Sequence, residues 1–464
     1  MNGMARAQAL LEQLALGAGL PAQAASRVRI IGADPVVRTV LRVGEAGAAA
    51  IAASGMAAAW LWFQKRGELQ QVTVEVAAAV AAMQSYKFLE IDGKPPGPVM
   101  DELTGFYPVK DARWIYLHCN FPNLAARNVQ ALGAEPTSSS VRAAAASWNG
   151  ADLEETILGA GGCAAFVRTE EEWRASPQGM AALAEPLLEI TKIADSPPMP
   201  LAQGERPLSG VRVLDLTRVL AGPTCAKNLA EHGADVLRIS RLGLPDSGVL
   251  DLDTSLGKLS AWLDLRDVAQ MQVMRELVKG CDVFSQAYRP GSLARRGLSP
   301  GELAQLRPGI VCVTLNAWGH RGPWSERRGY DTVVQAANGM AWTGAAKPPA
   351  LLPVAVQDYV AGYLMAYGAM VALSRRASEG GSWLVRVSLA ACGEWLRRQG
   401  RLTPLDCAHC PVQVPRTVVQ PWLAQSSSAA GLLTHLGSVT QMALTPTRWD
   451  RGAMVTGASA PAWP

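Results

Sequence analysis

Charged side chains are sparse in this sequence, and their signs nearly cancel. Asp, Glu, Lys and Arg make up 18% of the 464 residues, with 43 basic against 39 acidic residues and a net charge of +4. Hydrophobic residues make up 49%, a globular composition that excludes a mainly disordered protein. The balanced charge offers no basic stripe for a polynucleotide, so we expect no nucleic-acid partner, while an anionic small ligand stays open.

Cysteine is scarce as well, with eight residues scattered along the chain. A disulfide framework of the secreted type is therefore not expected. Cys407, His409 and Cys410 form one Cys-x-x-Cys cluster with a histidine inside it. A structural zinc site needs four ligands, usually from two such pairs, and the sequence holds no second pair. We expect free thiols and no metal here, with zinc as the alternative.

Long stretches that are both apolar and uncharged are few, and the only membrane candidate is Ala46 to Phe63, an uncharged stretch of 18 residues. It is rich in Ala and Gly and lies at the short end of what a membrane span requires, so we interpret it as a buried helix. The N-terminus carries Glu12 within its apolar part and does not resemble a signal peptide. We expect no membrane partner and a cytoplasmic location.

The length and the Pro-rich segment Asp195–Pro200 predict more than one domain. The first 40 residues, rich in Ala and Leu, predict helix, and Val43–Phe63 continues as an apolar helix. We expect four parts: an N-terminal helical segment at 1–90, a small α+β domain at 91–195, a catalytic domain at 205–400 and a tail at 401–464.

After Gly210, strand patterns alternate with helical ones. This spacing predicts βαβ units, and hence an α/β fold with a doubly wound parallel sheet. Such a sheet binds ligands at the carboxyl ends of its strands. The strands are expected at 211–216, 235–240, 261–265, 282–285 and 310–315, and helices at 222–232 and 268–279.

An internal repeat links the two ends of the chain. Val43–Ala79 aligns without gaps on Val356–Cys392, which indicates one supersecondary unit used twice. Glu45 falls on Asp358 in this alignment. Each acidic residue precedes an otherwise uncharged apolar helix, where a helix dipole also favours a negative charge.

An ordered series of motifs resembles the class III CoA transferases, the formyl-CoA and carnitine CoA-transferase type. The series spans Pro207 to Gly362. It comprises PLSGVRVLDLTRVLAGP at 207–223, GADVLRI at 233–239, LDLR at 263–266, DVF at 282–284, PGSLARRGL at 290–298, GYD at 329–331 and VQDYVAG at 356–362.

The resemblance implies a Rossmann-like CoA-binding catalytic domain, a smaller α+β domain and a mechanism. Asp358 matches the family nucleophile, which attacks an acyl-CoA thioester and passes CoA to a second carboxylic acid through anhydride and aspartyl-CoA intermediates. CoA is then a substrate, and no cofactor is covalently bound. A carboxylate suits the role because it is charged at neutral pH without a base. The alternative is that Asp358 only caps a helix.

The resemblance also implies a set of CoA contacts, rich in arginine because CoA is anionic. The matching positions are Leu220, Ala221, Arg241, Leu263, Arg266, Tyr288, Arg295, Arg328 and Tyr330.

The chain departs from the family pattern at several points. Ser240 and Ala287 stand where the family has Glu and Asn, and the Gly-rich flap expected before Phe106 is altered or lost. The small domain comes before the catalytic half, so the chain resembles the tail of one transferase followed by the head of another. Glu45 would then be the inactive nucleophile position of the first copy. The family's interlocked dimers make a homodimer the expected assembly.

Two other functions stay open. An acyl-CoA racemase or epimerase of the same superfamily needs an acid–base pair, usually with histidine at the position of Tyr330, where this chain has no histidine. A degenerate CoA-binding subunit would retain the fold and bind CoA without turnover.

Overall fold

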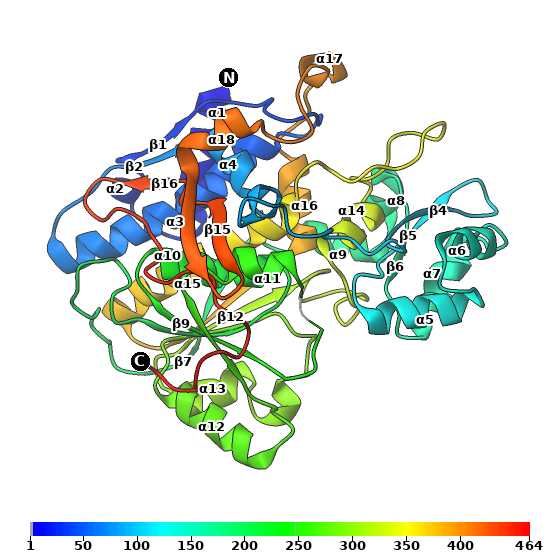
Figure 1. The fold of residues 1–464 in the computed structure, drawn as a ribbon. Coiled ribbons are helices and arrows are strands. Elements are labelled where there is room, and N and C mark those ends of the chain that lie inside the picture. The colour runs from blue at the N-terminus through cyan, green and yellow to red at the C-terminus, as the bar shows by residue number, and fades with distance from the viewer. Residues whose placement is uncertain (1–2, 246) are drawn as a thin grey trace.

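The computed structural model describes residues 3–245 and 247–464, and a seven-stranded sheet lies at its centre (Figure 1). Its strand order is β10-β9-β8-β11-β12-β13-β7, and all neighbours are parallel except β7, which pairs antiparallel with β13. The strands are β7 (Glu189–Ala194), β8 (Arg212–Leu216), β9 (Asp235–Ser240), β10 (Lys258–Trp262), β11 (Val283–Gln286), β12 (Val311–Asn316) and β13 (Ser382–Ser388).

The chain enters the parallel part of this sheet in the middle. It runs outward from β8 through β9 to β10, then returns to β11 and runs the other way to β13. This is the strand order of doubly wound α/β proteins, in which ligands bind where the two directions part. That point lies between β8 and β11. The expected α/β class with a mostly parallel sheet is confirmed.

Helices cover both faces of the sheet, because alternate strand residues point to opposite sides. Val213 belongs to the large core that contains α10 (Ala221–Glu231) and α15 (Val356–Glu379). The next residue, Leu214, belongs to a second core built with α12 (Val268–Lys279) and α13 (Pro300–Leu306). The long helix α15 is buried along most of its length.

An N-terminal unit packs beside the sheet and repeats its last part. β1 (Val28–Ile31) pairs in parallel with β2 (Val72–Glu75), as β12 does with β13. The connecting helix α3 (Val43–Arg66) has 24 residues, as α15 has, and the two helices pack against each other. α4 (Val76–Ala82) follows β2 as α16 (Leu389–Arg397) follows β13. The N-terminal unit and the last part of the sheet therefore share a strand, a long helix, a second strand and a further helix, in that order.

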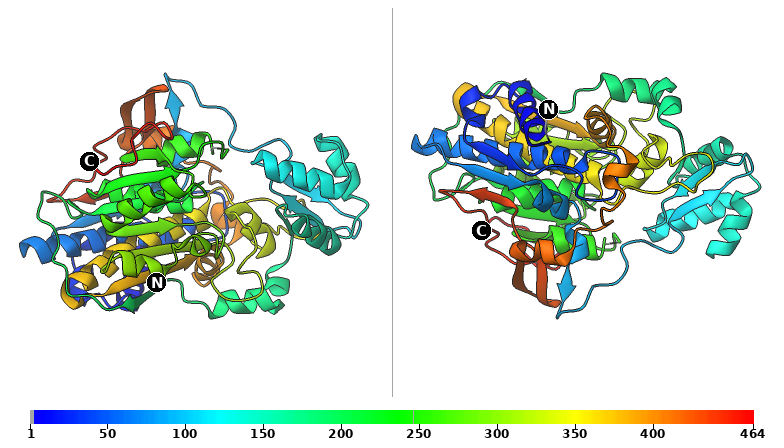
Figure 2. Two further views of the ribbon diagram at one scale, coloured as in Figure 1. Left: turned by 90° about the horizontal axis from the view of Figure 1, so that it is seen from below. Right: turned by 90° about the horizontal axis from the view of Figure 1, so that it is seen from above.

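Residues 105–166 form a lobe that projects from the main body (Figure 2). Its antiparallel sheet has the order β4-β5-β6 and packs on helices through a core of its own. The elements are β4 (Gly105–Pro108), β5 (Trp114–Leu117), β6 (Ala164–Phe166), α5 (Pro122–Leu132), α6 (Ser138–Ala145) and α7 (Gly150–Gly159). α8 (Glu170–Ala175) and α9 (Pro177–Ala184) then lead back to β7.

The C-terminal residues bind back onto the N-terminal unit. β16 joins the edge of β2, and β14 and β15 form a small sheet with β3. The remaining elements are α1 (Gly3–Gly17), α2 (Ala22–Ala25), η1 (Ser85–Phe88), β3 (Glu90–Ile91), α11 (Val249–Thr254), η2 (Ala294–Arg296), α14 (Asp331–Ala337), α17 (Pro404–Cys407), α18 (Arg416–Val419), η3 (Gln420–Trp422), β14 (Leu423–Ser428), β15 (Gly431–Leu436) and β16 (Thr440–Met442).

Two sequence expectations were wrong. The first 40 residues are not all helical, because β1 lies among them and is stabilised by pairing with the distant β2. The strand expected at 261–265 is β10, which begins at Lys258 and ends at Trp262. Helix α3 is apolar and long enough to span a membrane, and 83% of its most apolar window is buried within the protein.

Candidate active site

A cavity of about 210 Å³ opens at the carboxyl ends of β8 and β11. Leu216 at the end of β8 and Ala287 just after β11 line it, so it lies at the point where the sheet order reverses. Doubly wound proteins bind their ligands at this place. The walls also include Leu220, Ala221 and Asp358.

The turn after β8 is strained, and it presents backbone to this cavity. Val219 has a φ of 73°, a left-handed conformation that is uncommon for a β-branched residue. Thr217 is held by Asp215, which accepts a hydrogen bond from its backbone N–H at 3.1 Å. A Cβ on Gly222 would come within 2.3 Å of the Thr217 side chain, so only glycine allows this close turn. The strain is of the kind that clusters at ligand sites.

Asp358 is the third residue of α15, and its side chain lines the cavity. It is 8% exposed. Within the described part of the chain, no group donates a hydrogen bond to its carboxylate, and no cation pairs with it. A buried carboxylate without these partners is poorly stabilised as an anion, so it is more basic than an exposed one and a stronger nucleophile when it is ionised.

The amide of Asp358 is held by Asp331, the first residue of α14. Asp331 Oδ2 accepts a hydrogen bond from the Asp358 N–H at 3.0 Å, and its Oδ1 accepts one from the side-chain amide of Gln335. Burial is the main reason that the pKa of Asp358 lies well above its ordinary value, and the negative charge of Asp331 adds to the effect. Burial also raises the pKa of Asp331, to about 6.

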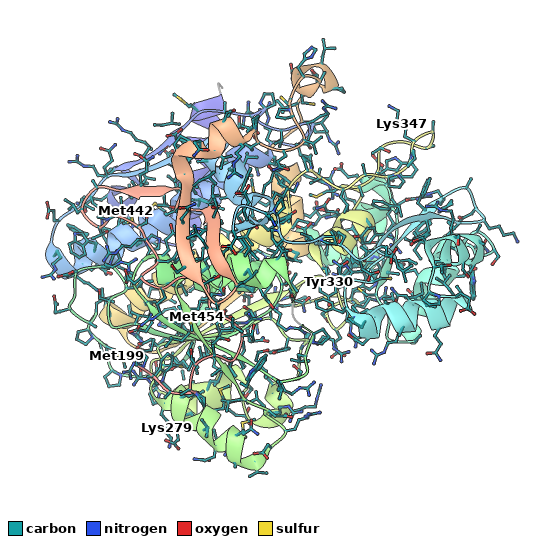
Figure 3. The ribbon with its side chains drawn as sticks, viewed as in Figure 1. Met199, Lys279, Tyr330, Lys347, Met442 and Met454 are labelled. Carbon is teal, nitrogen blue, oxygen red and sulfur yellow. The ribbon has the colours of Figure 1, made fainter. Side chains whose placement is uncertain are left out.

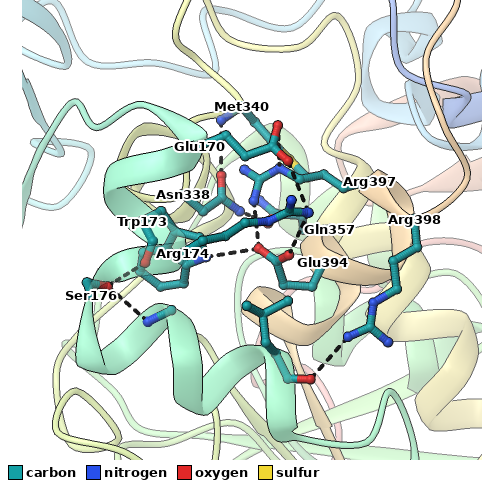
Figure 4. Close-up of polar contacts among 12 residues, drawn as sticks. Glu170, Trp173, Arg174, Ser176, Asn338, Met340, Gln357, Glu394, Arg397 and Arg398 are labelled. Carbon is teal, nitrogen blue, oxygen red and sulfur yellow. Dashed lines mark hydrogen bonds and ion pairs between the residues drawn. The ribbon is translucent and has the colours of Figure 1, made fainter.

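A buried polar network fixes the start of α15 (Figure 4). Gln357 accepts a hydrogen bond from Asn338 Nδ2 at 2.9 Å and donates one to the backbone oxygen of Asp331 at 3.3 Å. Nearby on α16, Glu394 accepts hydrogen bonds from the Trp173 indole at 2.9 Å and from Arg397 at 2.6 Å. Trp173 belongs to α8, so this network also ties the segment that follows the lobe to the main body.

Arginines give the cavity a positive lining. Arg218, Arg289 and Arg328 line it, and none of the three forms an ion pair with a described carboxylate. Arg218 donates to the backbone oxygen of Pro245, and Arg328 donates to that of Gly161. Guanidinium groups without a carboxylate beside a cavity suit an anionic ligand.

A second cavity of about 220 Å³ lies at the carboxyl ends of β9 and β10. It shares Leu216 and Tyr288 with the first cavity, so the two adjoin. Arg241 and Arg266 line it, and Arg266 forms an ion pair with Asp264 at 2.5 Å.

The structure gathers most of the expected site residues around these two cavities. Arg295 is the exception: it lies on η2, lines neither cavity, and its guanidinium packs over Gly291. The first cavity holds Leu220, Ala221, Tyr288, Arg328, Tyr330 and Asp358, and the second holds Arg241, Leu263, Arg266 and Tyr288.

Sequence reasoning missed the contribution of the lobe and the role of Asp331. Phe121, at the start of α5, lines the first cavity, and His118 stacks on Tyr330. Tyr330, labelled in Figure 3, lies where the lobe meets the main body. A signal for Asp331 was present, because Gly-x-Asp occurs at 329–331 and again as Gly32-Ala33-Asp34 ahead of the repeated helix.

Glu45, the residue that aligns with Asp358, is placed very differently. It is fully buried and pairs with Arg6 at 3.1 Å and Arg42 at 3.4 Å. A Cβ on Gly3 of helix α1 would come within 2.7 Å of its carboxylate, so α1 closes this position. Neither of the two cavities described reaches Glu45.

Comparison with known families agrees with this geometry. The profile of CoA-transferase family III matches residues 15–203 and again residues 208–403, most of the chain. This chain belongs to CoA-transferase family III. The two matches divide close to the Pro-rich segment at 195–200.

Curated relatives are matched over part of their length. Acetyl-coenzyme A transferase nodX of Hypoxylon pulicicidum is 37% identical over 205 residues, 42% of this chain and 34% of that protein. Human succinyl-CoA:glutarate CoA-transferase is 36% identical over 181 residues, 36% of this chain and 41% of that protein. A probable fatty acyl-CoA transferase of Mycobacterium tuberculosis is 32% identical over 207 residues, 41% and 52% respectively. The chain thus spans a third to a half of these relatives.

Solved structures are matched over a similar share. A protein of Mycobacterium tuberculosis is 31% identical, with 42% of this chain and 57% of that chain covered and a TM-score of 0.39. A CAIB/BAIF family protein of Brucella suis is 25% identical, with 49% and 65% covered and the same TM-score of 0.39.

Proposed function

We propose that this chain transfers CoA from an acyl-CoA to a free carboxylic acid, with Asp358 as the nucleophile. The observation that carries the proposal is the Asp358 carboxylate, which lines the cavity at the reversal point of the sheet and has neither a cation nor a hydrogen-bond donor among the described residues. Membership of CoA-transferase family III supports the reaction class.

The chemistry is a pair of exchanges on one carboxylate. Asp358 attacks the thioester carbonyl, and the C–S bond breaks to leave a mixed anhydride and the CoA thiolate. The thiolate then attacks the aspartyl carbonyl and releases the donor acid, leaving an aspartyl-CoA thioester. The acceptor carboxylate and the thiolate repeat these two steps in reverse, which restores Asp358 and forms the new acyl-CoA. Covalent catalysis of this kind replaces one difficult exchange with easier steps.

The two adjoining cavities have the charge that CoA requires. Its phosphates are anionic, and Arg241 and Arg266 line the cavity farther from Asp358. Arg218, Arg289 and Arg328 line the nearer one, where a thioester and an acceptor carboxylate would meet. We propose that CoA extends from the second cavity into the first, past Tyr288, which both cavities share.

Mass spectrometry after mixing the protein with acyl-CoA tests the proposal. Relatives are named for acetyl, succinyl and fatty acyl groups, so the panel contains one thioester of each kind. Borohydride or hydroxylamine quenching should change the mass of the peptide that holds Asp358, and Asp358→Asn should abolish the change. Glu45→Gln is the matched control, because it alters the repeated position without touching the cavity. Absence of any modification with every thioester, despite CoA binding, would favour the degenerate subunit.

We also propose the homodimer, the cytoplasmic location and the rearranged order of the two halves. The repeat and the double family match support the rearranged order. Light scattering tests the assembly, since a dimer has twice the chain mass of 49.1 kDa. A mass of one chain would instead indicate a monomer, in which α3 covers within one chain the surface of α15 that a second copy would otherwise cover.

A further inference from the structure

The repeat contains two copies of one capping arrangement. In each copy, a Gly-x-Asp segment precedes a helix of 24 residues, and its aspartate accepts a hydrogen bond from the third amide of that helix. Asp34 Oδ2 accepts from the Glu45 N–H at 2.8 Å, and Asp331 Oδ2 accepts from the Asp358 N–H at 3.0 Å. An amide in the first turn of a helix has no partner within the helix, so this bond fixes the position of the acidic residue.

The surroundings of the two acidic residues differ. Arg6 and Arg42 pair with Glu45, and the positive charge of Arg42 also lowers the pKa of Asp34, against the opposite effect of burial and of Glu45. Among the described residues, no cation pairs with Asp358 or Asp331. The repulsion between the Asp331 and Asp358 carboxylates is therefore not offset by an ion pair with a described cation.

We propose that Asp331 is a positioning residue that orients Asp358 through its amide and, by its own charge, sets the pH at which Asp358 becomes a nucleophile. This inference rests on the proposed function of Asp358. The capping bond by itself is not evidence of a catalytic role for Asp331, because Asp34 makes the same bond at a place that neither described cavity reaches. The distinguishing property is the negative charge of Asp331 beside the Asp358 carboxylate, which pairs with no cation among residues 3–245 and 247–464.

Other ionisable groups surround Asp331 and Asp358. Tyr86 on η1, Tyr116 on β5 and Cys392 on α16 face one or both carboxyls and are all buried or nearly so. Burial raises the pKa of Tyr86 to about 12 and raises the pKa of Tyr116 and of Cys392 well above their ordinary values, so all three stay neutral at physiological pH. The arginines Arg218, Arg289, Arg327 and Arg328 line the same cavity as Asp358. Asp331 is thus the charged group that acts most strongly on Asp358.

The sign of the effect follows from like-charge repulsion. A negative Asp331 disfavours the negative form of Asp358, so the pKa of Asp358 rises. Asp331→Asn keeps an oxygen that can accept the Asp358 N–H and removes the charge. The pKa of Asp358 should then fall, and the acid limb of the kcat/KM profile should move to lower pH. Because interacting carboxyls titrate as a pair, the midpoint of the acid limb is an apparent pKa of Asp331 and Asp358 together.

The experiment compares Asp331→Asn with Asp34→Asn in pH profiles of CoA transfer. We expect the acid limb to move down by about one pH unit in Asp331→Asn, a tenfold gain in kcat/KM on that limb. The plateau at high pH should fall, since a less basic carboxylate is a weaker nucleophile. Asp34→Asn loses the matched charge in the repeat and should leave the limb unmoved. Asp331→Ser, which also removes the charge and retains an acceptor, serves if Asp331→Asn does not fold.

A second readout does not depend on turnover. Carbodiimide activates only the protonated carboxyl, so labelling of Asp358 at a given pH, located by peptide mass spectrometry, should be slower in Asp331→Asn than in the parent. If Asp331→Asn still transfers CoA but shows neither a shift of the acid limb nor a change in labelling, the inference is wrong and the proposed function is unaffected. If the parent protein shows no turnover and no acyl adduct, the proposed function fails, and the labelling still reports whether Asp331 controls Asp358.

Discussion

The imidazole of His118 stacks on the ring of Tyr330, with centroids 3.9 Å apart and planes inclined by 16°. His118 comes from the lobe and Tyr330 from the wall of the cavity, so one contact joins the two parts at the active site. Both ring nitrogens of His118 are buried and find no hydrogen-bond partner in the described part of the chain, and burial lowers the pKa of this histidine to about 3. The stack is therefore neutral at physiological pH, and it acts through packing.

His118→Phe and His118→Ala separate packing from polarity. Phe keeps the stack and removes two unsatisfied nitrogens, so the free energy of unfolding should stay the same or rise by about 1 kcal/mol. Ala removes the stack, should destabilise the protein by about 2 kcal/mol, and should raise KM for acyl-CoA because Tyr330 loses its support. Urea unfolding and steady-state kinetics check both. Equal loss in the two variants would point to a polar role for His118.

A buried ion pair stabilises the strand end that leads into the cavity. Lys258 Nζ lies 2.8 Å from Asp215 Oδ2, and both side chains are almost fully buried. Lys258→Met should reduce the free energy of unfolding by about 3–5 kcal/mol, because it leaves a buried charge unpaired. Adding Asp215→Asn to Lys258→Met should recover part of the loss, since Asn is neutral and can still accept from Thr217. Urea midpoints measure both, and a double variant no more stable than Lys258→Met would contradict this account.

The raised pKa of Asp358 has a consequence for stability. Its pKa is higher in the folded protein than in the unfolded chain, so folding favours the protonated form. The free energy of unfolding therefore falls as pH rises from the unfolded pKa through the folded one. Asp358→Asn cannot ionise, so its Tm should exceed that of the parent by several degrees at pH 7. The difference should shrink below about pH 4, where the parent carboxyl is protonated in both states. Calorimetry at the two pH values tests this.

Glu45 should matter for folding and not for turnover. Its carboxylate pairs with Arg6 and Arg42 in the interior, away from both cavities. Glu45→Gln leaves two partly buried guanidinium groups, those of Arg6 and Arg42, without their carboxylate and should cost about 2 kcal/mol in the free energy of unfolding. The value of kcat/KM should stay within about twofold of the parent, against a loss of at least about a thousandfold in Asp358→Asn. Loss of turnover in folded Glu45→Gln would assign this position a role in the reaction.

The sequence predicted the elements whose signals are local and periodic. Strand β9 and helix α12 have the bounds expected from their patterns, and the carboxyl ends of the strands did mark the cavity. The repeat was visible because α3 and α15 both retain long apolar sequences. These features depend on residues close together in the chain.

The sequence predictions were wrong or incomplete where contacts between distant residues determine the structure. β1 has four residues and exists through its pairing with β2, which no local pattern reveals. β10 begins at Lys258, and a lysine is not expected in a buried strand. Its burial is possible because Asp215, 43 residues away in the sequence, pairs with it. Asp331 stands next to the expected Tyr330, yet its contact with Asp358 spans 27 residues.

The second cavity gives a test of how CoA is held. Arg241 lines it and forms no ion pair with a described carboxylate, so we expect it to bind a phosphate of CoA. Arg241→Gln should raise KM for acyl-CoA about 10- to 100-fold, the value of one charge-assisted hydrogen bond, with little change in kcat. Arg275→Gln, which changes an exposed arginine on α12 away from both cavities, is the matched control. If Arg241 binds the 3′-phosphate, acyl-dephospho-CoA should show no such difference between the parent and Arg241→Gln. An equal rise in KM with both thioesters would place Arg241 on the pyrophosphate, and an unchanged KM would show that CoA does not reach this cavity.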